Sequence, residues 1–292
     1  MSELTTSTPV DQPVERAELP DKYLRFKLYD RVEHFLLMLS FIILSVTGLP
    51  QMFATEPWAQ TMVRWMGGIT LVRTIHHWSA VLLVLVSFLA MFLFVYRFYV
   101  RGDRSPMFPI GKDATDVLHT VTYNLGFRTE PPKMGRFNFG EKFEYWAVIW
   151  GTAVMIITGF IMWNPITFSS VFPGQLIPIA KAAHGWEALL AVTAVIVWHM
   201  YNVHIKHFNR SIFTGYISRE EMEEEHALEL ERLDAGGETW PEIYAPVKRR
   251  RQRIYFAVST VVGILLLIFV VWAFTFEETA ITTVIPTVTP VP

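Results

Sequence analysis

The sequence predicts an all-α integral membrane protein, in which a four-helix transmembrane bundle is followed by a fifth, C-terminal transmembrane helix. Hydrophobic residues make up 52% of the 292 positions, only 18% are charged, and the mean hydropathy is +0.31. Aromatic residues reach 14%, with 10 Trp and 22 Phe, an excess typical of helices with aromatic belts at a lipid boundary. A chain this apolar cannot be enclosed in one soluble core.

Five apolar segments are long enough to cross about 30 Å of hydrocarbon, which takes roughly 20 helical residues. The last of them contains no charge from Ile254 to Phe276. The first is not expected to be a secretory signal peptide, because it begins too far into the chain and lacks a small-residue cleavage site. The predicted spans lie near residues 33–53, 75–98, 143–163, 183–204 and 254–276.

The distribution of Lys and Arg predicts the orientation of these spans. The segments before, between and after the first four spans carry five, two, eight, one and nine basic residues in order. Basic residues concentrate on the cytoplasmic side of membrane proteins. We therefore expect a multi-pass protein of the cytoplasmic (inner) membrane, with a cytoplasmic N-terminus and the tail after Phe276 outside.

The chain outside the spans has little room for a separate domain. A short interfacial helix is expected over residues 112–126, and Ser218 followed by Glu221 is a capping box that predicts a solvated acidic helix over residues 218–234. No internal repeat and no GxGxxG nucleotide fingerprint is present. The predicted organisation begins with an N-terminal cytoplasmic arm (residues 1–24) and a four-helix domain (25–217). An acidic helix with a basic linker (218–253), the fifth span (254–276) and an outer-side tail (277–292) follow.

The chain has nine histidines and no cysteine, which excludes disulfides, Cys-ligated zinc, iron–sulfur clusters and covalently attached c-type haem. His34 lies at the cytoplasmic start of the first span, and His76 and His77 lie at the outer start of the second. His184 starts the fourth span, and His199 follows fifteen residues later, about 22 Å deeper and about 60° around the helix. Each ionisable side chain in a bilayer is a functional candidate.

The depths of these histidines match in two pairs. His34 shares its depth with His199, and His184 shares its depth with His76 or His77. Two stacked pairs of imidazoles are what two six-coordinate haems in a four-helix bundle require. A proton relay is the main alternative, but it needs carboxylates between the imidazoles, and the span interiors carry only Glu187. The other histidines are expected at the interface (His204, His207) or solvated (His119, His226).

Two arginines repeat the same spacing to a histidine. Arg31 precedes His34 by three residues, and Arg73 precedes His76 by three, which places a guanidinium one turn from each imidazole and within reach of a haem propionate. The repetition favours His76 over His77 as the ligand. Four glycines in or beside the spans would let a flat macrocycle pack closely, although ordinary helix contacts explain them equally well: Gly48, Gly151, Gly159 and Gly185.

These motifs resemble the di-haem cytochrome b (gamma) subunit of respiratory formate dehydrogenases and membrane-bound hydrogenases, including variants associated with multihaem cytochrome c partners. The resemblance rests on Arg31–His34, on Arg73-Thr-Ile-His76, on His199-Met-Tyr201 and on two longer stretches, Asn138-Phe-Gly-Glu-Lys142 and Thr158-Gly-Phe-Ile-Met-Trp-Asn-Pro165. It spans about residues 25–225. The segment Asn209–Ser218 is closest to the multihaem-partner variants.

The resemblance implies an electron-transfer subunit that is catalytic only within a complex. Two haem b groups would connect an outer-side redox partner with the quinone pool. The cytoplasmic haem would be bound by His34 and His199, and the outer haem by His76 and His184. The partner would be a multihaem cytochrome c, or an iron–sulfur subunit of a formate dehydrogenase- or hydrogenase-like enzyme. Membrane lipid is the other expected contact, and no nucleic acid is expected.

The resemblance also implies a site for menaquinone or ubiquinone beside the cytoplasmic haem. In the family, an Asn-x-Gly before the third helix and the fourth-helix ligand take part, which here are Asn138, Gly140 and His199. Glu141 stands where the formate dehydrogenase subunit has Gln. Glu141 or Glu144 would carry protons to the quinone if burial raised its pKa.

Two further departures from the family bear on the structure. The two ligands of the fourth helix lie one residue further apart than in the formate dehydrogenase subunit, a difference that a π-bulge or a shifted haem plane would absorb. The fifth helix is an addition. Two other functions are compatible with the same spans, namely a stand-alone cytochrome b561-like transmembrane oxidoreductase and a haem-free membrane anchor.

Overall fold

The computed structural model describes residues 20–102, 107–206, 208–237 and 243–275. Five helical segments in these ranges are long and apolar enough to cross a membrane, which confirms the all-α multi-pass prediction. The predicted arm up to residue 19, the outer-side tail and His207 lie outside the described residues. The five segments are Leu28–Met52, Ile69–Arg101, Phe139–Trp163, Leu176–Lys206 and Ala245–Ala273.

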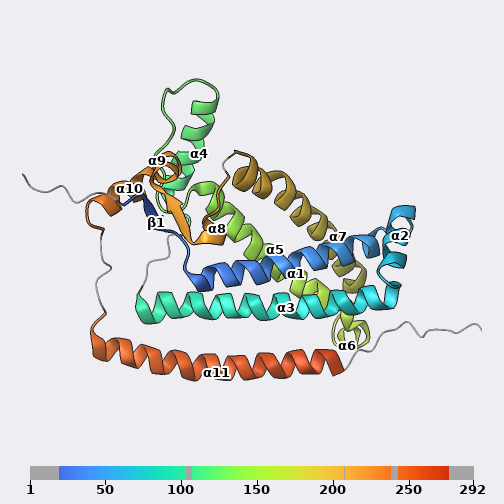
Figure 1. Ribbon diagram of the computed structural model, residues 1–292. Helices are drawn as coiled ribbons and strands as arrows, with labels where there is room; N and C mark the ends of the chain where they lie inside the picture. Colours follow the sequence, from blue (N-terminus) through green and yellow to red (C-terminus); the bar gives the residue numbers. More distant parts are fainter. Residues whose placement is uncertain (1–19, 103–106, 207, 238–242, 276–292) are drawn as a thin grey trace, which may run out of the picture.

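The first four segments form two helical hairpins (Figure 1). Helix α1 (Leu28–Met52) packs along α3 (Ile69–Val95), and α5 (Phe139–Trp163) packs along α7 (Leu176–Ala194). The hairpins meet where α1 contacts α7. We call the end of the bundle at which α1 begins the His34 end, and the opposite end the His76 end. Two short helices lie at the His76 end, α2 (Pro57–Trp65) and α6 (Pro165–Ser169).

Every spanning helix begins before the residue predicted from hydropathy, because helical turns continue from the apolar window into more polar sequence. At the start of α5, Asn138 caps the helix: its side-chain oxygen accepts the Glu141 amide at 2.9 Å. The largest extension is in α11 (Ala245–Thr275), so the residues from Lys248 to Arg253, predicted as a linker, are helical.

Three π-helical segments interrupt the regular helices at the His34 end. They are η1 (Tyr96–Arg101), η2 (Val195–His199) and η3 (Tyr201–Lys206). Segment η2 follows α7 directly and ends at His199, in the stretch after His184 where a π-bulge was one of two expected ways to absorb the extra residue in the spacing. A π-turn accommodates an inserted residue and changes the direction of the side chains that follow.

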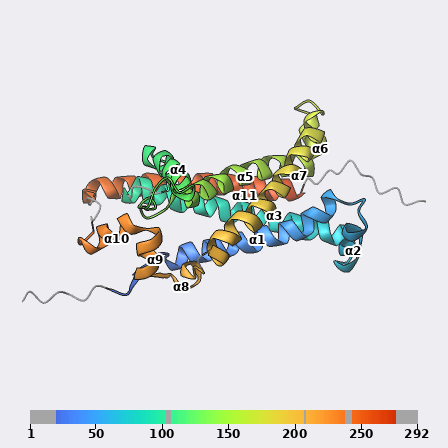
Figure 2. The ribbon, with the colours of Figure 1, turned by 90° about the horizontal axis from the view of Figure 1, so that it is seen from above.

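Helix α11 lies along the outside of the bundle, beside α3 (Figures 1 and 2). At the His34 end, the Tyr255 hydroxyl donates to the Phe92 carbonyl at 3.0 Å, and the Tyr255 ring meets Tyr96 edge-on at 5.2 Å. At the other end, Phe269 packs on Phe160 of α5 with ring centres 5.0 Å apart. The fifth helix therefore contacts both hairpins through aromatic side chains.

A small non-membrane unit, which we call the platform, covers the His34 end. Strand β1 (Lys22–Leu24) pairs antiparallel with β2 (Tyr216–Ser218), and the buried side chains of Ile217, Met222 and Leu230 form its apolar cluster. This pairing joins the predicted N-terminal arm to the residues after the fourth span. The platform also contains α8 (Ser211–Thr214), α9 (Arg219–Glu225) and α10 (Ala227–Asp234).

The prediction of one solvated acidic helix over residues 218–234 was wrong. Ser218 caps α9 with Glu221 as predicted, but the helix ends at His226 and α10 starts anew. One face of each helix is buried because Met222 and Leu230 pack into the platform. Several acidic residues of this segment are exposed, whereas its few apolar residues decide the packing.

Helix α4 (Gly111–Asn124) confirms the helix predicted over residues 112–126. Its apolar side chains Val117, Leu118 and Val121 are exposed, while Asp116 is buried. The Asp116 carboxylate accepts from the Lys112 ammonium at 2.6 Å. An apolar face turned outward and an ion pair turned inward are typical of a helix that lies on a membrane surface.

His226, predicted to be solvated, is fully buried. Its Nδ1–H donates to the Gly135 carbonyl at 2.9 Å, and burial, followed by the nearby Arg25 guanidinium, lowers the pKa of the imidazole to about 4. The other histidine predicted to be solvated, His119, is half-buried and lies 3.1 Å from the Glu130 carbonyl. The prediction was wrong for His226 because chain segments far apart in sequence enclose it.

We expect His226→Gln to remove a pH dependence from the stability of the platform. The native imidazole has a pKa of about 4, against 6.5 when solvated, so protons favour the unfolded form. The stability that His226 confers is complete above about pH 6.5 and is lost as the pH falls toward 4, on the order of 3 kcal/mol over the window.

Gln keeps an N–H donor for the Gly135 carbonyl and does not titrate. Hydrogen exchange of residues 208–237 in detergent, followed from pH 7 to pH 4, measures the difference. Parallel pH profiles for the two proteins would contradict the assignment of a neutral His226.

Candidate functional site

Two histidines face each other at the His76 end of the bundle. The ring centres of His76, from α3, and His184, from α7, lie 6.4 Å apart with their planes at 66°. A metal ion bound between two imidazole nitrogens by bonds of about 2 Å separates the ring centres by about 6 to 6.5 Å. The spacing is too wide for ring stacking and has the length that one shared ion requires.

Both of these rings are oriented by threonine hydroxyls. Thr47 Oγ1 lies 2.9 Å from His76 Nδ1 and 2.7 Å from the carbonyl oxygen of its own helix four residues earlier. Thr158 repeats this with His184 at 2.9 Å and its own helix carbonyl at 2.6 Å. Because each hydroxyl donates its proton to the carbonyl, it accepts from the imidazole Nδ1–H. The Nε2 lone pair of both rings is therefore left for a metal.

The residue after each threonine is a glycine that makes room for the ring. A Cβ on Gly48 would lie 3.0 Å from His76 Cε1, and a Cβ on Gly159 would lie 3.3 Å from His184 Cε1. Both distances are tighter than ordinary van der Waals contact. These two glycines therefore permit close approach of the imidazoles, which the sequence alone did not distinguish from helix packing.

A second pair of histidines lies at the His34 end. The ring centres of His34, from α1, and His199, the last residue of η2, are also 6.4 Å apart, with planes at 33°. His199 Nδ1 lies 2.9 Å from Glu144 Oε2. In a neutral ring protonated at Nδ1, that proton goes to the carboxylate and the lone pair is on Nε2. The structure thus brings together the two pairs that the depth argument predicted.

His77 does not join either pair. Its ring stacks on Trp163 of α5, with centres 4.0 Å apart and planes at 22°. The neighbouring His76 faces His184 instead. The geometry agrees with the choice of His76, which rested on the repeated arginine spacing.

The arginines before the two histidines differ in their contacts. The Arg31 guanidinium donates to the Phe213 carbonyl of α8, but its buried Nε has no hydrogen-bond partner within the described residues. Arg73 is half-buried, and the described part of the chain provides no hydrogen bond or ion pair to it. An unsatisfied guanidinium nitrogen and an unpaired cation beside the histidine pairs suit a carboxylate-bearing ligand.

Iron in a porphyrin is the metal centre that this donor set fits. No group of three or more His, Asp or Glu side chains able to hold a metal occurs among the described residues. Each pair offers two neutral imidazoles on opposite sides, and a porphyrin supplies the four remaining nitrogens to a six-coordinate iron. The glycines at the rings and the arginines beside them fit a flat macrocycle with propionates.

The residues predicted to bind quinone lie close to His199 but have protein partners. The Asn138 and Glu141 side chains form the cap of α5, and Glu141 Oε1 accepts from the buried Arg25 at 3.0 Å. A Cβ on Gly140 would lie 3.7 Å from Trp198, beside His199. His199, which the resemblance places at both the haem and the quinone, has its Nδ1 2.9 Å from Glu144 Oε2.

Sequence reasoning missed the supporting residues of these sites. Thr47 and Thr158 were not considered as ring acceptors, and Arg25 was not considered at all. A signal for the threonines was present, because a Thr-Gly pair occurs near the end of the first and third spans, at residues 47–48 and 158–159. Arg25 carried no signal, since its partners come from a segment over 100 residues away.

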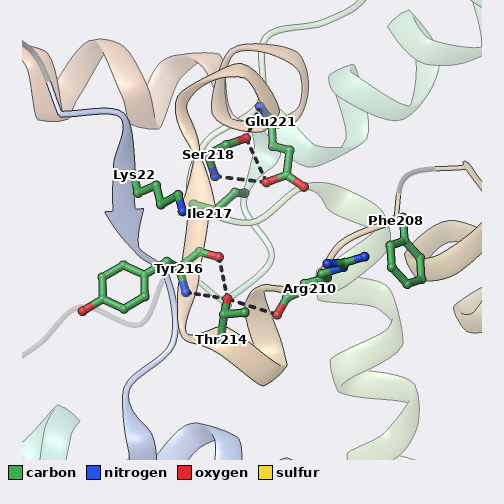
Figure 3. A pocket seen from close by; sticks show the side chains of 8 residues that line it. All are labelled: Lys22, Phe208, Arg210, Thr214, Tyr216, Ile217, Ser218 and Glu221. Carbon is green, nitrogen blue, oxygen red and sulfur yellow. Dashed lines mark hydrogen bonds between the residues drawn. The ribbon is translucent and has the colours of Figure 1, made fainter.

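A surface cavity of about 240 Å³ lies in the platform (Figure 3). Lys22 and Glu221 are among the side chains that line it, and Thr214 Oγ1 closes one wall by its bonds to Tyr216 and to the Arg210 carbonyl. None of the residues predicted for haem or quinone lines this cavity. It therefore plays no part in the candidate site.

The chain is similar in sequence to cytochrome subunits of formate dehydrogenases. The cytochrome b556(Fdn) subunit of a nitrate-inducible formate dehydrogenase from Escherichia coli (strain K12) is 25% identical over 219 residues, which cover 74% of this chain and 94% of that protein. The cytochrome b556(fdo) subunit of a formate dehydrogenase from the same strain is 29% identical over 181 residues, covering 62% and 78%. A cytochrome b556 subunit of a formate dehydrogenase from Haemophilus influenzae is 23% identical over 198 residues, covering 68% and 77%.

The family match extends over the part of the chain that carries both histidine pairs. The sequence model described as "Prokaryotic cytochrome b561" matches residues 25–215. This range begins beside β1 and includes all four helices of the two hairpins together with α8. With its five apolar helices and its paired imidazoles, this multi-pass membrane protein belongs to the prokaryotic cytochrome b561 family.

Proposed function

We propose that this chain is the cytochrome b subunit of a respiratory membrane complex and that it moves electrons between an outer-side redox partner and the quinone pool. The observation that carries the proposal is the pair of 6.4 Å imidazole separations, one at each end of the bundle. Membership of the family implies haem b, and the two pairs support two haems per chain. Each bound haem supplies a reversible one-electron couple within the membrane.

The residues of the chain hold and orient these groups. His34 and His199 would bind one haem, and His76 and His184 the other, each through Nε2. Arg31 would pair with a propionate through its unsatisfied edge. Arg73 would play the same part at the other site, as the repeated spacing predicted.

The relatives support a partner that joins the chain to a redox enzyme. Three similar proteins are cytochrome subunits of formate dehydrogenases, and one of them aligns over 94% of its length. We propose an iron–sulfur subunit or a multihaem cytochrome c as the partner, at the His76 end. The basic-residue distribution supports an outer location for that end and a cytoplasmic location for the N-terminus and the platform.

The quinone would bind at the His34 end, beside the start of α5. Asn138 uses its side-chain oxygen for capping, which leaves its amide N–H groups as donors to a quinone carbonyl. Gly140 lets the start of α5 lie close to Trp198, because a Cβ there would be 3.7 Å from the Trp198 ring and 3.2 Å from Asn138 Oδ1. Glu141, at the start of α5, is held by an ion pair with Arg25. Its carboxyl would take up protons from water and deliver them to the quinone.

We expect His34→Ala and His76→Ala each to remove one haem and to leave the other in place. Each substitution deletes one of two axial ligands to a single iron. Reduced-minus-oxidised spectra of the two purified proteins, with haem counted per chain, make the test. His77→Ala is the matched control and should keep both haems, because the His77 ring stacks on Trp163. Retention of both haems in His34→Ala and His76→Ala would overturn the ligand assignment.

We expect Glu141→Gln to slow quinone turnover by about a hundredfold and to leave both haem spectra unchanged, because an amide cannot carry a proton. Gln preserves the capping box at the third position of α5. Glu130→Gln, which changes an exposed carboxylate remote from α5, is the control. Turnover is measured with a soluble quinone analogue and the intact complex. Native turnover in Glu141→Gln would remove Glu141 from proton delivery.

The family description also favours a second candidate, a stand-alone cytochrome b561-like transmembrane oxidoreductase. The two functions differ in what co-purifies. A respiratory subunit should be isolated from native membranes with a stoichiometric redox partner. The stand-alone protein should pass electrons across a liposome membrane without any partner.

A further inference from the structure

The two histidine pairs have hydrogen-bond acceptors of different charge. At the His76 end, both Nδ1 protons go to neutral hydroxyls, those of Thr47 and Thr158. At the His34 end, His199 donates its Nδ1 proton to the Glu144 carboxylate at 2.9 Å, and the described residues provide no hydrogen bond to the His34 ring. The two sites thus have the same kind of ligand, a pair of imidazoles, but differ in the charge of the groups that accept the Nδ1 protons.

The charge of the acceptor changes how strongly an imidazole donates to iron. A carboxylate that accepts the Nδ1–H shifts electron density toward Nε2 and raises the basicity of the ligand. A more basic axial ligand stabilises ferric over ferrous iron and so lowers the reduction potential. A hydroxyl that is itself donating to a carbonyl is a neutral acceptor, and its bond orients the ring with a smaller effect on its basicity.

We infer that Glu144 is a positioning residue that selectively lowers the reduction potential of the haem bound by His34 and His199, while Thr47 and Thr158 orient the other pair without adding charge. The inference rests on the proposed function, since it requires both haems. It assigns Glu144 a role through His199 and not in direct contact with a substrate. The partly buried side chain of Glu144 holds this geometry.

The arginines do not produce the same asymmetry. Each pair has one arginine three residues before a histidine, Arg31 at one end and Arg73 at the other, and both are partly buried. Their positive charges act on the two sites in the same direction. The Glu144 carboxylate, which lies against His199 Nδ1, is the charged contact that distinguishes the Nδ1 partners at the His34 end from those at the His76 end.

Spectroelectrochemical titration of the intact complex tests the inference. One electron from the mediator reduces one ferric iron, and every Nδ1 proton stays in place, so the measured potential reports the ligand environment directly. We expect Glu144→Gln to raise the potential of one haem and to leave the other unchanged. Thr158→Val should affect only the other haem, so the two variants are controls for each other. The His34→Ala and His76→Ala proteins, each with one haem, identify which potential belongs to which site.

Two further variants separate charge and orientation from general disturbance. Glu144→Asp keeps the carboxylate and should shift the potential less than Glu144→Gln. Ser45→Ala removes a hydroxyl of α1 that bonds only to its own helix at 2.8 Å, and it should leave both potentials native. Low-temperature EPR of the ferric protein should show a changed g anisotropy for one low-spin signal in Glu144→Gln.

An unchanged potential in Glu144→Gln, or an equal shift of both haems, would overturn the inference and leave the proposed function intact. If Glu144→Gln loses a haem, Glu144→Asp is measured in its place. We then expect one haem to have a reduction potential more positive than in the native protein. A native potential for both haems would overturn the inference. A complex without two haems would instead overturn the proposed function.

Discussion

The hydrogen bonds to imidazole Nδ1 are the interactions on which the rest of the structure depends. A polar ring inside a bilayer has no water to satisfy its nitrogens, so a hydrogen-bond partner within the bundle stabilises it. Thr47, Thr158 and Glu144 provide these partners for His76, His184 and His199. Where Nδ1 is bonded in this way, Nε2 is the nitrogen left for a metal, and the facing rings at each end of the bundle lie 6.4 Å apart.

The backbone is adapted to the same requirement. The glycines after the two threonines let the rings at the His76 end approach α1 and α5, where a Cβ would intrude at 3.0 to 3.3 Å. The π-segment η2 sets the direction of His199 after the fifteen residues that separate it from His184. The platform then closes the His34 end through Arg25, whose guanidinium reaches Glu141 on α5 and the Arg136 carbonyl.

Hydropathy and residue spacing were enough to predict the five spans and the pairing of His34 with His199 and of His76 with His184. A π-bulge in the fourth span was one of two expectations raised by the comparison with the family spacing, and η2 lies in that span. These features are local or follow from depth in a bilayer, which the sequence encodes directly. The platform could not be predicted, because β1 and β2 are three-residue strands that meet across nearly 200 residues. The burial of His226 and the Arg25–Glu141 bond depend on the same distant contacts. Thr47 and Thr158 were readable from the repeated Thr-Gly pairs, but only once the rings they face were known.

The central claim is that each facing pair of imidazoles binds one haem iron. A pyridine haemochrome assay combined with iron analysis and amino-acid quantification of the purified chain tests it most directly. The account predicts two haem b groups and two iron atoms per chain, both low-spin with two imidazole ligands. A preparation that is folded in the membrane and carries no haem, or carries iron without porphyrin, would contradict it.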